Sequence, residues 1–360
     1  MHVAIVEPFY TGSHKYWVDR LEQHLNCEVS VFSLPGRFWK WRMTMGAVDL
    51  AKQVNDSGIA IDLFLVTDML DASLFKALLK EPYSHKPMVL YMHENQIVYP
   101  YQTPPEHQNW DRHYGIINVK SALVADQIWF NSKFHKNVFY EQLLPFLKAF
   151  PDTDVLLKEV AQLPQKSHVV PLGIDLSKLQ TSIIQKSEKH TILWNHRWEF
   201  DKNPKDFFHA LRNLSKHGLD FDLIVCGESF VKYPVVFDHA KIELEKHIIH
   251  WGYAETKEAY YDLIKQSTVL PVTSNQEFFG LSVMEAVACQ VKPILPNRLS
   301  YPELYGMLDV SFYSTFIEFE DAIRHELNQP FKALNTDFLQ HYDWPQVADL
   351  YVKKLASLVS

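Results

Sequence analysis

Short apolar runs alternate with helix-like patterns through the first half of the chain. Residues 3–6 form the kind of apolar run that a buried strand shows, and we expect this strand to stop at residues 7–8. A helical pattern follows, with Ser13 as its predicted N-cap. Further strands are predicted at residues 29–32, 63–66, 88–91 and 127–130. Such alternation is typical of a parallel α/β sheet.

The same alternation begins again after residues 171–189, a polar and lightly structured segment that we interpret as an inter-domain linker. Strands are predicted at 191–194, 223–226, 248–251, 269–272 and 293–295, and helices at 204–217, 256–266, 280–289 and 344–359. We therefore predict two Rossmann-like, doubly wound α/β domains that face each other across a cleft. Their ligands are expected at the carboxyl ends of the strands. The domains are placed at 1–175 and 190–340, and the helix at 341–360 can cross back to the first domain.

The composition is that of a globular protein. Of 360 residues, 47% are hydrophobic and 22% are charged, which excludes a disordered chain, a collagen and a coiled coil. The three cysteines form no Cys-X-X-Cys pair, so neither a disulfide framework nor a structural zinc site is expected. A cytoplasmic location is expected, because we see no signal-peptide pattern and no membrane-length apolar stretch. The net charge of −8 argues against broad coating of nucleic acid, although it allows a local basic patch.

Two segments of the N-terminal half carry candidate binding chemistry. Residues 8–15 join a strand to a helix, so backbone N–H groups at Gly12 and Ser13 could bind an anion; the alternative is a plain turn with a serine cap. Residues 36–43 are expected to form a loop in which cations and aromatic rings alternate, as in RNA-binding segments. The alternative is a loop that packs its tryptophans on the core. The candidate RNA contacts are Arg37, Trp39, Lys40, Trp41 and Arg42.

Four hydrogen-bonding side chains follow the strand predicted at 88–91. They are His93, Glu94, Asn95 and Gln96. Because they come directly after the end of a strand, we interpret them as an array for sugar hydroxyls rather than as turn chemistry alone.

The C-terminal half contains a pair of cations and a pair of carboxylates. Arg197 and Lys202 follow a predicted strand and could clamp a diphosphate; the alternative is a solvated loop with local pairs to Glu199 and Asp201. Glu277 and Glu285 stand eight residues apart, with Glu277 expected before a helix and Glu285 two turns inside it. Positions seven or eight apart lie on one helix face, so both carboxylates can point into one cleft. Carboxylates accept hydrogen bonds from ribose diols and sugar hydroxyls, and N–H groups near Gly280 could meet a phosphate.

Metal-dependent sugar transfer has no support in these patterns. The two Asp-X-Asp strings, at 152–154 and 220–222, do not follow strands, and the 18 histidines show no metal-ligand spacing.

The chain resembles two nested families of glycosyltransferases. Its residues 250–253, 277–286 and 302–303 are similar to the retaining GT-B glycosyltransferases of family 4, in which Glu277 and Glu285 match the EX7E pair. The chain also resembles the tRNA-queuosine mannosyltransferase family, through residues 7–15, 34–42, 93–96 and 99–100 of its N-terminal half and through residues 197–204. One departure is Gln290, which stands where a small residue is usual.

This resemblance implies an activity and a set of roles. The donor would be GDP-mannose and the acceptor would be queuosine in the anticodon of tRNA(Asp), with retained configuration and no metal. Arg197 and Lys202 would hold the diphosphate, Glu285 the ribose and Glu277 the transferred sugar, while His93 would contact that sugar near the reacting carbon. Backbone N–H groups of Gly12, Ser13, Gly280 and Leu281 would assist, and Phe279 would line the donor site. The tRNA would contact residues 37–42 together with Lys133 and Lys136, and the acceptor nucleoside would contact residues 94–96.

Two alternatives stay open at this point. A family-4 glycosyltransferase could act on a lipid-linked or small-molecule acceptor, or the chain could be a non-catalytic RNA-binding protein on the same fold. The presence of Arg197, Lys202, Glu277 and Glu285 argues against the second alternative.

Overall fold

The computed structural model describes residues 1–98, 108–180, 186, 189–229 and 231–359. The resemblance at 99–100 and part of the predicted linker therefore lie outside the described residues. The chain forms two compact units, which we describe separately. The first combines Met1–Gly173 with Tyr342–Ser360, and the second is Ile174–His341. None of the helices in the described part is long and apolar enough to cross a membrane.

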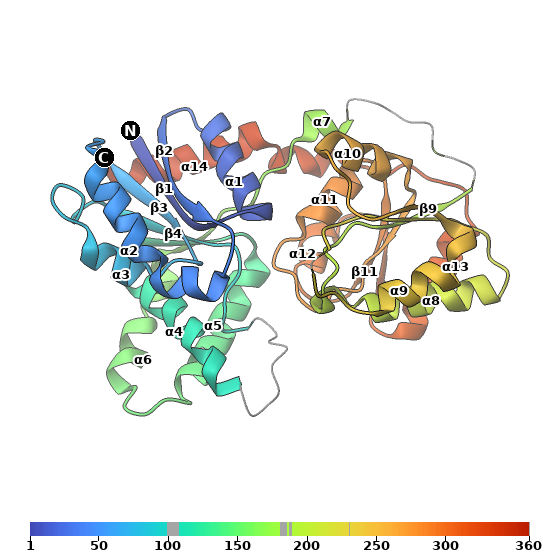
Figure 1. The fold of residues 1–360 in the computed structure, drawn as a ribbon, viewed down its shortest axis with the longest axis horizontal. Helices are drawn as coiled ribbons and strands as arrows, with labels where there is room; N and C mark the ends of the chain where they lie inside the picture. Colours follow the sequence, from blue (N-terminus) through green and yellow to red (C-terminus); the bar gives the residue numbers. More distant parts are fainter. Residues whose placement is uncertain (99–107, 181–185, 187–188, 230, 360) are drawn as a thin grey trace. The chain divides into compact units, whose positions relative to one another are not determined.

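The first unit is a parallel sheet covered by helices (Figure 1). Its described strands follow the order β2-β1-β3-β4-β5-β6. Strand β2 is added on one side of β1 and strands β3 to β6 on the other, so the topological switch point lies between β1 and β3. The strands are β1 His2–Tyr10, β2 Glu28–Pro35, β3 Leu63–Thr67, β4 Met88–Met92, β5 Gln127–Phe130 and β6 Ser167–Val169. The helices are α1 Gly12–His24, α2 Trp39–Ser57, α3 Ala72–Leu78, α4 Gln108–Val124, α5 Lys133–Leu147 and α6 Asp154–Val160, with a 3₁₀ turn at Leu163–Lys166.

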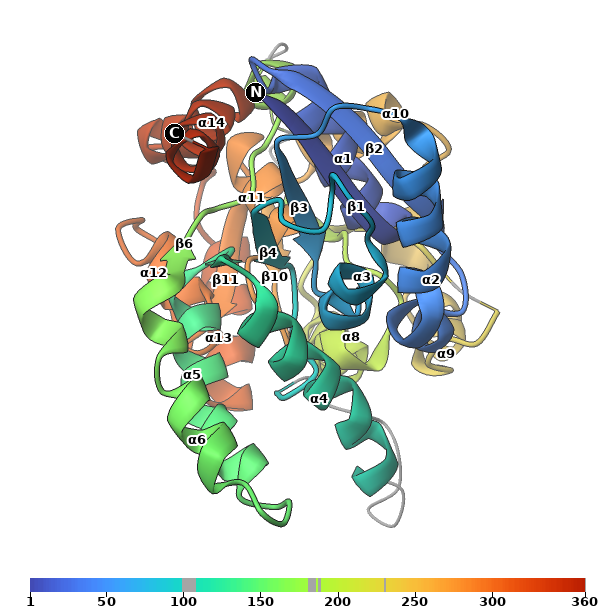
Figure 2. The ribbon, with the colours of Figure 1, turned by 90° about the vertical axis from the view of Figure 1, so that its left-hand side faces the viewer.

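The C-terminal helix α14, Trp344–Val359, belongs to this first unit. It packs against α1 and β3 (Figure 2), and Trp17 donates a hydrogen bond from Nε1 to the Tyr351 hydroxyl at 3.1 Å. Trp344 is buried against Gly173, where a Cβ atom would come within 2.4 Å of the indole ring. A glycine at this position therefore allows the terminal helix to dock.

The second unit repeats the doubly wound plan with the strand order β12-β11-β10-β7-β8-β9. The strands are β7 Thr191–Trp194, β8 Asp222–Val225, β9 Ile248–Trp251, β10 Val269–Pro271, β11 Lys292–Pro296 and β12 Ser311–Tyr313. The helices are α7 Leu176–Gln180, α8 Pro204–Lys216, α9 Val236–Glu243, α10 Lys257–Gln266, α11 Leu281–Ala288, α12 Tyr301–Tyr305 and α13 Phe316–Leu327. Short 3₁₀ turns lie at Phe200–Lys202, Glu245–His247 and Asp337–Tyr342.

Two local predictions are wrong, each for a packing reason. Strand β1 continues past residues 7–8, because Pro8 follows the last pairing of β1 with β3 and its missing N–H breaks no bond there. Residues 39–43 are the start of α2 instead of a loop, since Met43, Ala47 and Leu50 continue a buried helical face. The boundary between the two units, after Gly173, lies inside the predicted linker, which also contains helix α7, whose leucines are buried and which packs against α11.

Candidate functional site

Each sheet places polar side chains at the carboxyl ends of the strands where its winding reverses. In the first unit these are Glu7 in β1, Asp68 after β3 and His93 after β4. In the second unit they follow β7 and β10. Ligands of open α/β sheets bind at such switch points.

Glu7 and His14 form a buried ion pair at the first switch point. The Glu7 Oε2 atom lies 2.9 Å from His14 Nδ1, and Glu7 Oε1 accepts a 2.8 Å hydrogen bond from the backbone N–H of Phe9. Burial lowers the pKa of His14, but the Glu7 carboxylate outweighs that effect and raises the pKa to about 9. His14 is therefore a cation at neutral pH, and its ring lies against the ring of His93.

The half-buried imidazole of His93 completes this cluster. Its ring lies 4.4 Å from that of His14, 4.7 Å from Trp17 and 4.8 Å from Tyr91, measured between ring centroids. Burial, followed by the positive charge of His14, lowers the pKa of His93 well below its usual range. Its Nε2 atom makes no hydrogen bond to any described residue. A neutral imidazole with a free nitrogen suits a contact with a sugar hydroxyl.

Asp68 fixes the backbone that carries His93. Its Oδ1 accepts a 2.7 Å hydrogen bond from the His93 N–H, and Asn131 Nδ2 donates to the His93 carbonyl at 2.8 Å. Burial raises the pKa of Asp68 to about 8. Glu7, His14 and His93 also offer ligand atoms within 4.8 Å of one another, a grouping that could hold a metal ion, although His14 would first have to lose its proton.

The three residues that follow His93 make hydrogen bonds within their own turn. The buried Asn95 accepts from the backbone N–H groups of Ile97 and Val98 at 3.2 and 3.1 Å, and Gln96 Nε2 donates to Glu94 Oε1 at 2.8 Å. Glu94 is half-buried and Gln96 is buried. Their expected contact with the acceptor stays a prediction.

Helix α1 begins one residue earlier than its predicted cap. Gly12, at φ 51°, is its first residue, and Thr11 occupies the N-cap position without a side-chain hydrogen bond. Ser13 is thus inside the first turn, and the N-cap prediction is wrong. Both Gly12 and Ser13 are exposed, so the first turn of α1 is accessible to solvent, as anion binding there requires.

Cations and aromatic rings of residues 37–42 remain largely at the surface. The exposed fraction is 74% for Phe38 and 60% for Trp41, and Arg37 and Lys40 are also exposed. Trp39 packs on Tyr114 of α4 at a centroid distance of 5.1 Å, with Lys40 Nζ 5.5 Å from both rings. The structure thus separates the tryptophans, with one packed and one free for a partner.

The three remaining cationic side chains predicted to contact tRNA differ in their local contacts and exposure. Arg42 donates from Nε to the Pro35 carbonyl at 3.3 Å, and Lys136 donates from Nζ to the Ser167 carbonyl at 2.8 Å. Lys133 is exposed at the start of α5. Of these three side chains, Lys136 is thus held against β6.

Lys202 is the centre of the polar cluster in the second unit. Its buried ammonium lies 3.3 Å from Glu277 Oε2 and 3.1 Å from Asp201 Oδ2, and it donates to the Gln276 carbonyl at 3.0 Å. Burial lowers the pKa of Lys202, but the two carboxylates outweigh this effect and raise it. Arg197 pairs with Glu199 at 3.1 Å and keeps about half of its side chain exposed (48%). The local ion pairs to Glu199 and Asp201, which were the alternative interpretation of this segment, are therefore present. The Arg197 side chain is nevertheless half exposed.

Glu277 reaches this cluster from a loop and not from a helix. Helix α11 begins at Leu281, so Glu277 precedes the helix and Glu285 lies inside it, as predicted. Because residues 277–280 are not helical, the helix-face spacing expected to align the two carboxylates does not apply to Glu277. The loop turns at Gly280, whose φ of 85° favours glycine and where a Cβ atom would lie 3.3 Å from Glu277 Cγ. The preceding Phe279 is buried. Close packing of this turn directs the Glu277 carboxylate toward Lys202.

Glu285 lies inside α11 and is held by two residues that the sequence analysis missed. Lys257 Nζ donates to Oε1 at 2.7 Å, and the Tyr260 hydroxyl donates to Oε2 at 2.9 Å. Asn195, at the end of β7, donates from Nδ2 to the Tyr260 hydroxyl at 3.2 Å. A buried carboxylate needs hydrogen-bond donors such as these, but no local sequence motif identifies donors that come from another helix.

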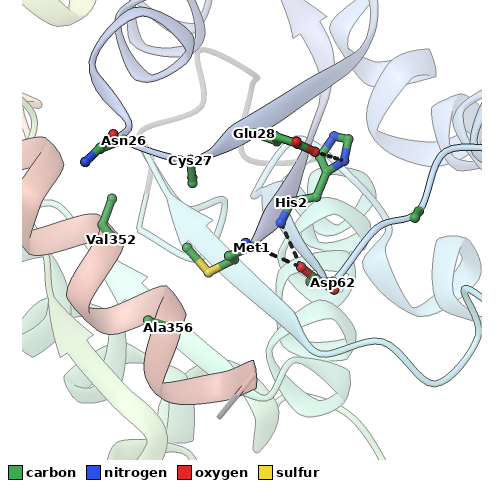
Figure 3. Close-up of a pocket in the computed structure, with 9 residues that line it drawn as sticks. Met1, His2, Asn26, Cys27, Glu28, Asp62, Val352 and Ala356 are labelled. Atoms are coloured by element: carbon green, nitrogen blue, oxygen red, sulfur yellow. Dashed lines mark hydrogen bonds and ion pairs between the residues drawn. The ribbon is translucent and has the colours of Figure 1, made fainter.

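A separate hollow of about 560 Å³ lies at the amino ends of β1 and β2 (Figure 3). It is lined by Met1, Cys27 and Val352 among others, and by none of the predicted site residues. Burial raises the pKa of the Cys27 thiol, which favours its protonated form.

Comparison with known proteins assigns both units. Residues 2–174 match the family described as tRNA-queuosine alpha-mannosyltransferase N-terminal, and residues 178–328 match Glycosyl transferases group 1. The sucrose-phosphate synthase of Thermosynechococcus elongatus has the same fold, with a TM-score of 0.73 at 14% identity over 99% of this chain and 100% of that one. The predicted GT-B class of fold is thereby confirmed.

Two curated relatives are mannosyltransferases. The GDP-mannose:cellobiosyl-diphosphopolyprenol alpha-mannosyltransferase of Xanthomonas campestris is 22% identical over 67% of this chain and 65% of its own length. The tRNA-queuosine alpha-mannosyltransferase of Drosophila melanogaster is 31% identical over 99% of this chain and 97% of its own length. The chain therefore belongs to the tRNA-queuosine alpha-mannosyltransferase family of glycosyltransferases.

Proposed function

We propose that this protein transfers mannose from GDP-mannose to queuosine in the anticodon of tRNA(Asp), with retention of the anomeric configuration. The observation that carries the proposal is the 31% identity with the Drosophila enzyme over 99% of the chain, which includes both units. A free tRNA substrate and three unpaired cysteines fit a cytoplasmic location.

The second unit supplies the groups that suit a nucleotide sugar. Arg197 and Lys202 are assigned to the diphosphate, together with N–H groups at Gly280 and Leu281 at the start of α11. Two carboxylates already surround Lys202, so its charge alone would not hold a diphosphate, and Arg197 and the helix terminus are needed as well. Glu277 is assigned to the mannose and Glu285 to the ribose. The relative whose name contains GDP-mannose supports the choice of donor.

The reaction exchanges one bond at the anomeric carbon for another. The bond from this carbon to the diphosphate oxygen breaks, and the acceptor hydroxyl oxygen bonds to the same face. The hydroxyl proton leaves to the departing phosphate, so no side-chain base is required. Cations fixed near that phosphate stabilise the charge that grows on it, and this lowers the barrier. His93 is assigned to the sugar near the reacting carbon, and Gly12 and Ser13 to the diphosphate. No metal takes part in this proposed scheme.

A transfer assay tests the whole proposal. Purified protein is mixed with GDP-mannose and with tRNA from cells that make queuosine or from cells that cannot. We expect queuosine in the digested nucleosides to gain the mass of one hexose in the first sample only. Donor binding without any such gain would contradict the tRNA acceptor and favour a lipid-linked or small-molecule acceptor instead.

The exposed ring of Trp41 is expected to stack on a base of the tRNA. Stacking on an aromatic side chain contributes about 1–3 kcal/mol per base, so Trp41→Ala should weaken tRNA binding by that amount. Trp41→Phe keeps an aromatic face and should retain most of the affinity. Filter binding with queuosine tRNA measures both variants. Equal affinity of Trp41→Ala and the unmodified protein would remove residues 37–42 from the tRNA contact.

A further inference from the structure

The carboxylate of Glu285 is held in one fixed orientation by two donors from α10. Its side chain is 3% exposed, with Lys257 on Oε1 and Tyr260 on Oε2. The two donors stand three residues apart, so they lie on the same face of α10. Each oxygen therefore has one partner, and the plane of the carboxylate is set by two points.

The hydrogen bond from Tyr260 has a defined direction. Asn195 Nδ2 donates to the Tyr260 hydroxyl at 3.2 Å and also to the Ser282 carbonyl at 2.8 Å. Since the hydroxyl has a single proton and accepts from Asn195, that proton points to Glu285. Burial raises the pKa of Tyr260 well above its usual range, so the proton stays in place. A chain of hydrogen bonds thus runs from the end of β7 through α10 to α11.

The Glu285 carboxylate keeps acceptor positions for a ligand. A carboxylate has about four lone-pair positions, two on each oxygen. Among the described residues, Lys257 and Tyr260 occupy one position on each oxygen of Glu285. One position on each oxygen remains, and two neighbouring acceptors of this kind match the two hydroxyls of a vicinal diol.

We propose that Tyr260 and Lys257 are positioning residues that turn Glu285 so that it accepts both the 2′- and the 3′-hydroxyl of the donor ribose. The inference rests on the proposed role of Glu285 in ribose binding. Without the Tyr260 hydroxyl the carboxylate can rotate, and it no longer presents both oxygens to the diol. The loss should therefore be large for a ligand with the diol and small for a ligand without it.

Calorimetric titration with GDP and with 2′,3′-dideoxy-GDP compares a ligand that has the ribose diol with one that lacks it. We expect the full chain to bind GDP at least about tenfold more tightly than the dideoxy compound, and Tyr260→Phe to reduce that ratio to below about threefold. Tyr261→Phe is the matched control, because it removes the same atom from the next residue of α10 and keeps the ring, whose centroid lies 5.0 Å from Lys257 Nζ. The control should keep the ratio of the unmodified protein.

Lys257→Met gives an independent readout should Tyr260→Phe fail to fold. The Lys257 side chain is 41% exposed, so its removal disturbs the core little, and the ratio should again fall. An unchanged ratio in a folded Tyr260→Phe or Lys257→Met variant would overturn the positioning role while the transfer reaction stands. Equal binding of GDP and the dideoxy compound by the unmodified protein would overturn the role of Glu285 in ribose binding, and this inference with it.

Discussion

Replacing Lys202 by methionine is expected to lower the turnover number for mannosyl transfer by about 10²–10³-fold. The buried ammonium is aimed by Glu277, Asp201 and the Gln276 carbonyl, so it is fixed before any donor binds. Under the proposed mechanism it meets negative charge that grows only as the diphosphate departs. A fixed cation removed from such a position costs about 3–4 kcal/mol of barrier, whereas ground-state binding changes less.

The measurement is single-turnover transfer at saturating donor, with GDP affinity determined separately. Lys205→Met is the control, because it removes an exposed lysine at the start of α8, three residues along the chain. Since Lys202→Met leaves the buried Asp201 carboxylate and the half-buried Glu277 carboxylate without their cation, urea unfolding must confirm that the variant is folded. A folded variant with a turnover number within threefold of the unmodified protein would exclude Lys202 from the chemistry.

The sequence predicts strands best where both faces are buried. The runs at 63–66 and 88–91 are apolar throughout because β3 and β4 lie in the centre of the first sheet, and the structure places both strands there. Helix α4 is different. Its buried face contains Asn118 and Ser121, which donate to the carbonyls of Asp68 and Leu70 at 3.0 Å. These polar residues interrupt the apolar pattern, so no periodicity indicated the helix.

The candidate site likewise contains residues that the sequence indicated and residues that it did not. Arg197, Lys202 and Glu277 stand out in the sequence because they lie in segments that follow strands, and Glu285 because it stands eight residues after Glu277. Their charges suit a nucleotide sugar. Lys257 and Tyr260 have no such signal, since their role depends on how α10 packs beside α11. The pairing of Glu7 with His14 was missed for a related reason. It joins a strand to the following helix across a turn whose shape could not be read from residue types alone.

The ion pair between Glu7 and His14 should be a large source of stability in the first unit, and one that depends on pH. Both side chains are buried, and removing one partner of a buried pair typically costs about 3–5 kcal/mol. We therefore expect Glu7→Gln to lower the free energy of unfolding of the first unit by about that amount at pH 6. Glu22→Gln, which removes an exposed carboxylate from α1, should have little effect.

The difference between Glu7→Gln and the unmodified protein should shrink as the pH rises. Folding raises the pKa of His14 from 6.5 to about 9, so the stabilisation is complete below pH 6.5 and is lost as the pH passes through about 9. A rise of this size corresponds to about 3 kcal/mol, which agrees with the expected cost of breaking the pair. Above that range the unmodified protein holds a buried Glu7 carboxylate beside a neutral imidazole, and the variant should equal it in stability. Urea unfolding followed by tryptophan fluorescence at pH 6, 8 and 10 measures this trend. A difference that stays constant across these three values would mean that a charged His14 does not stabilise the folded protein.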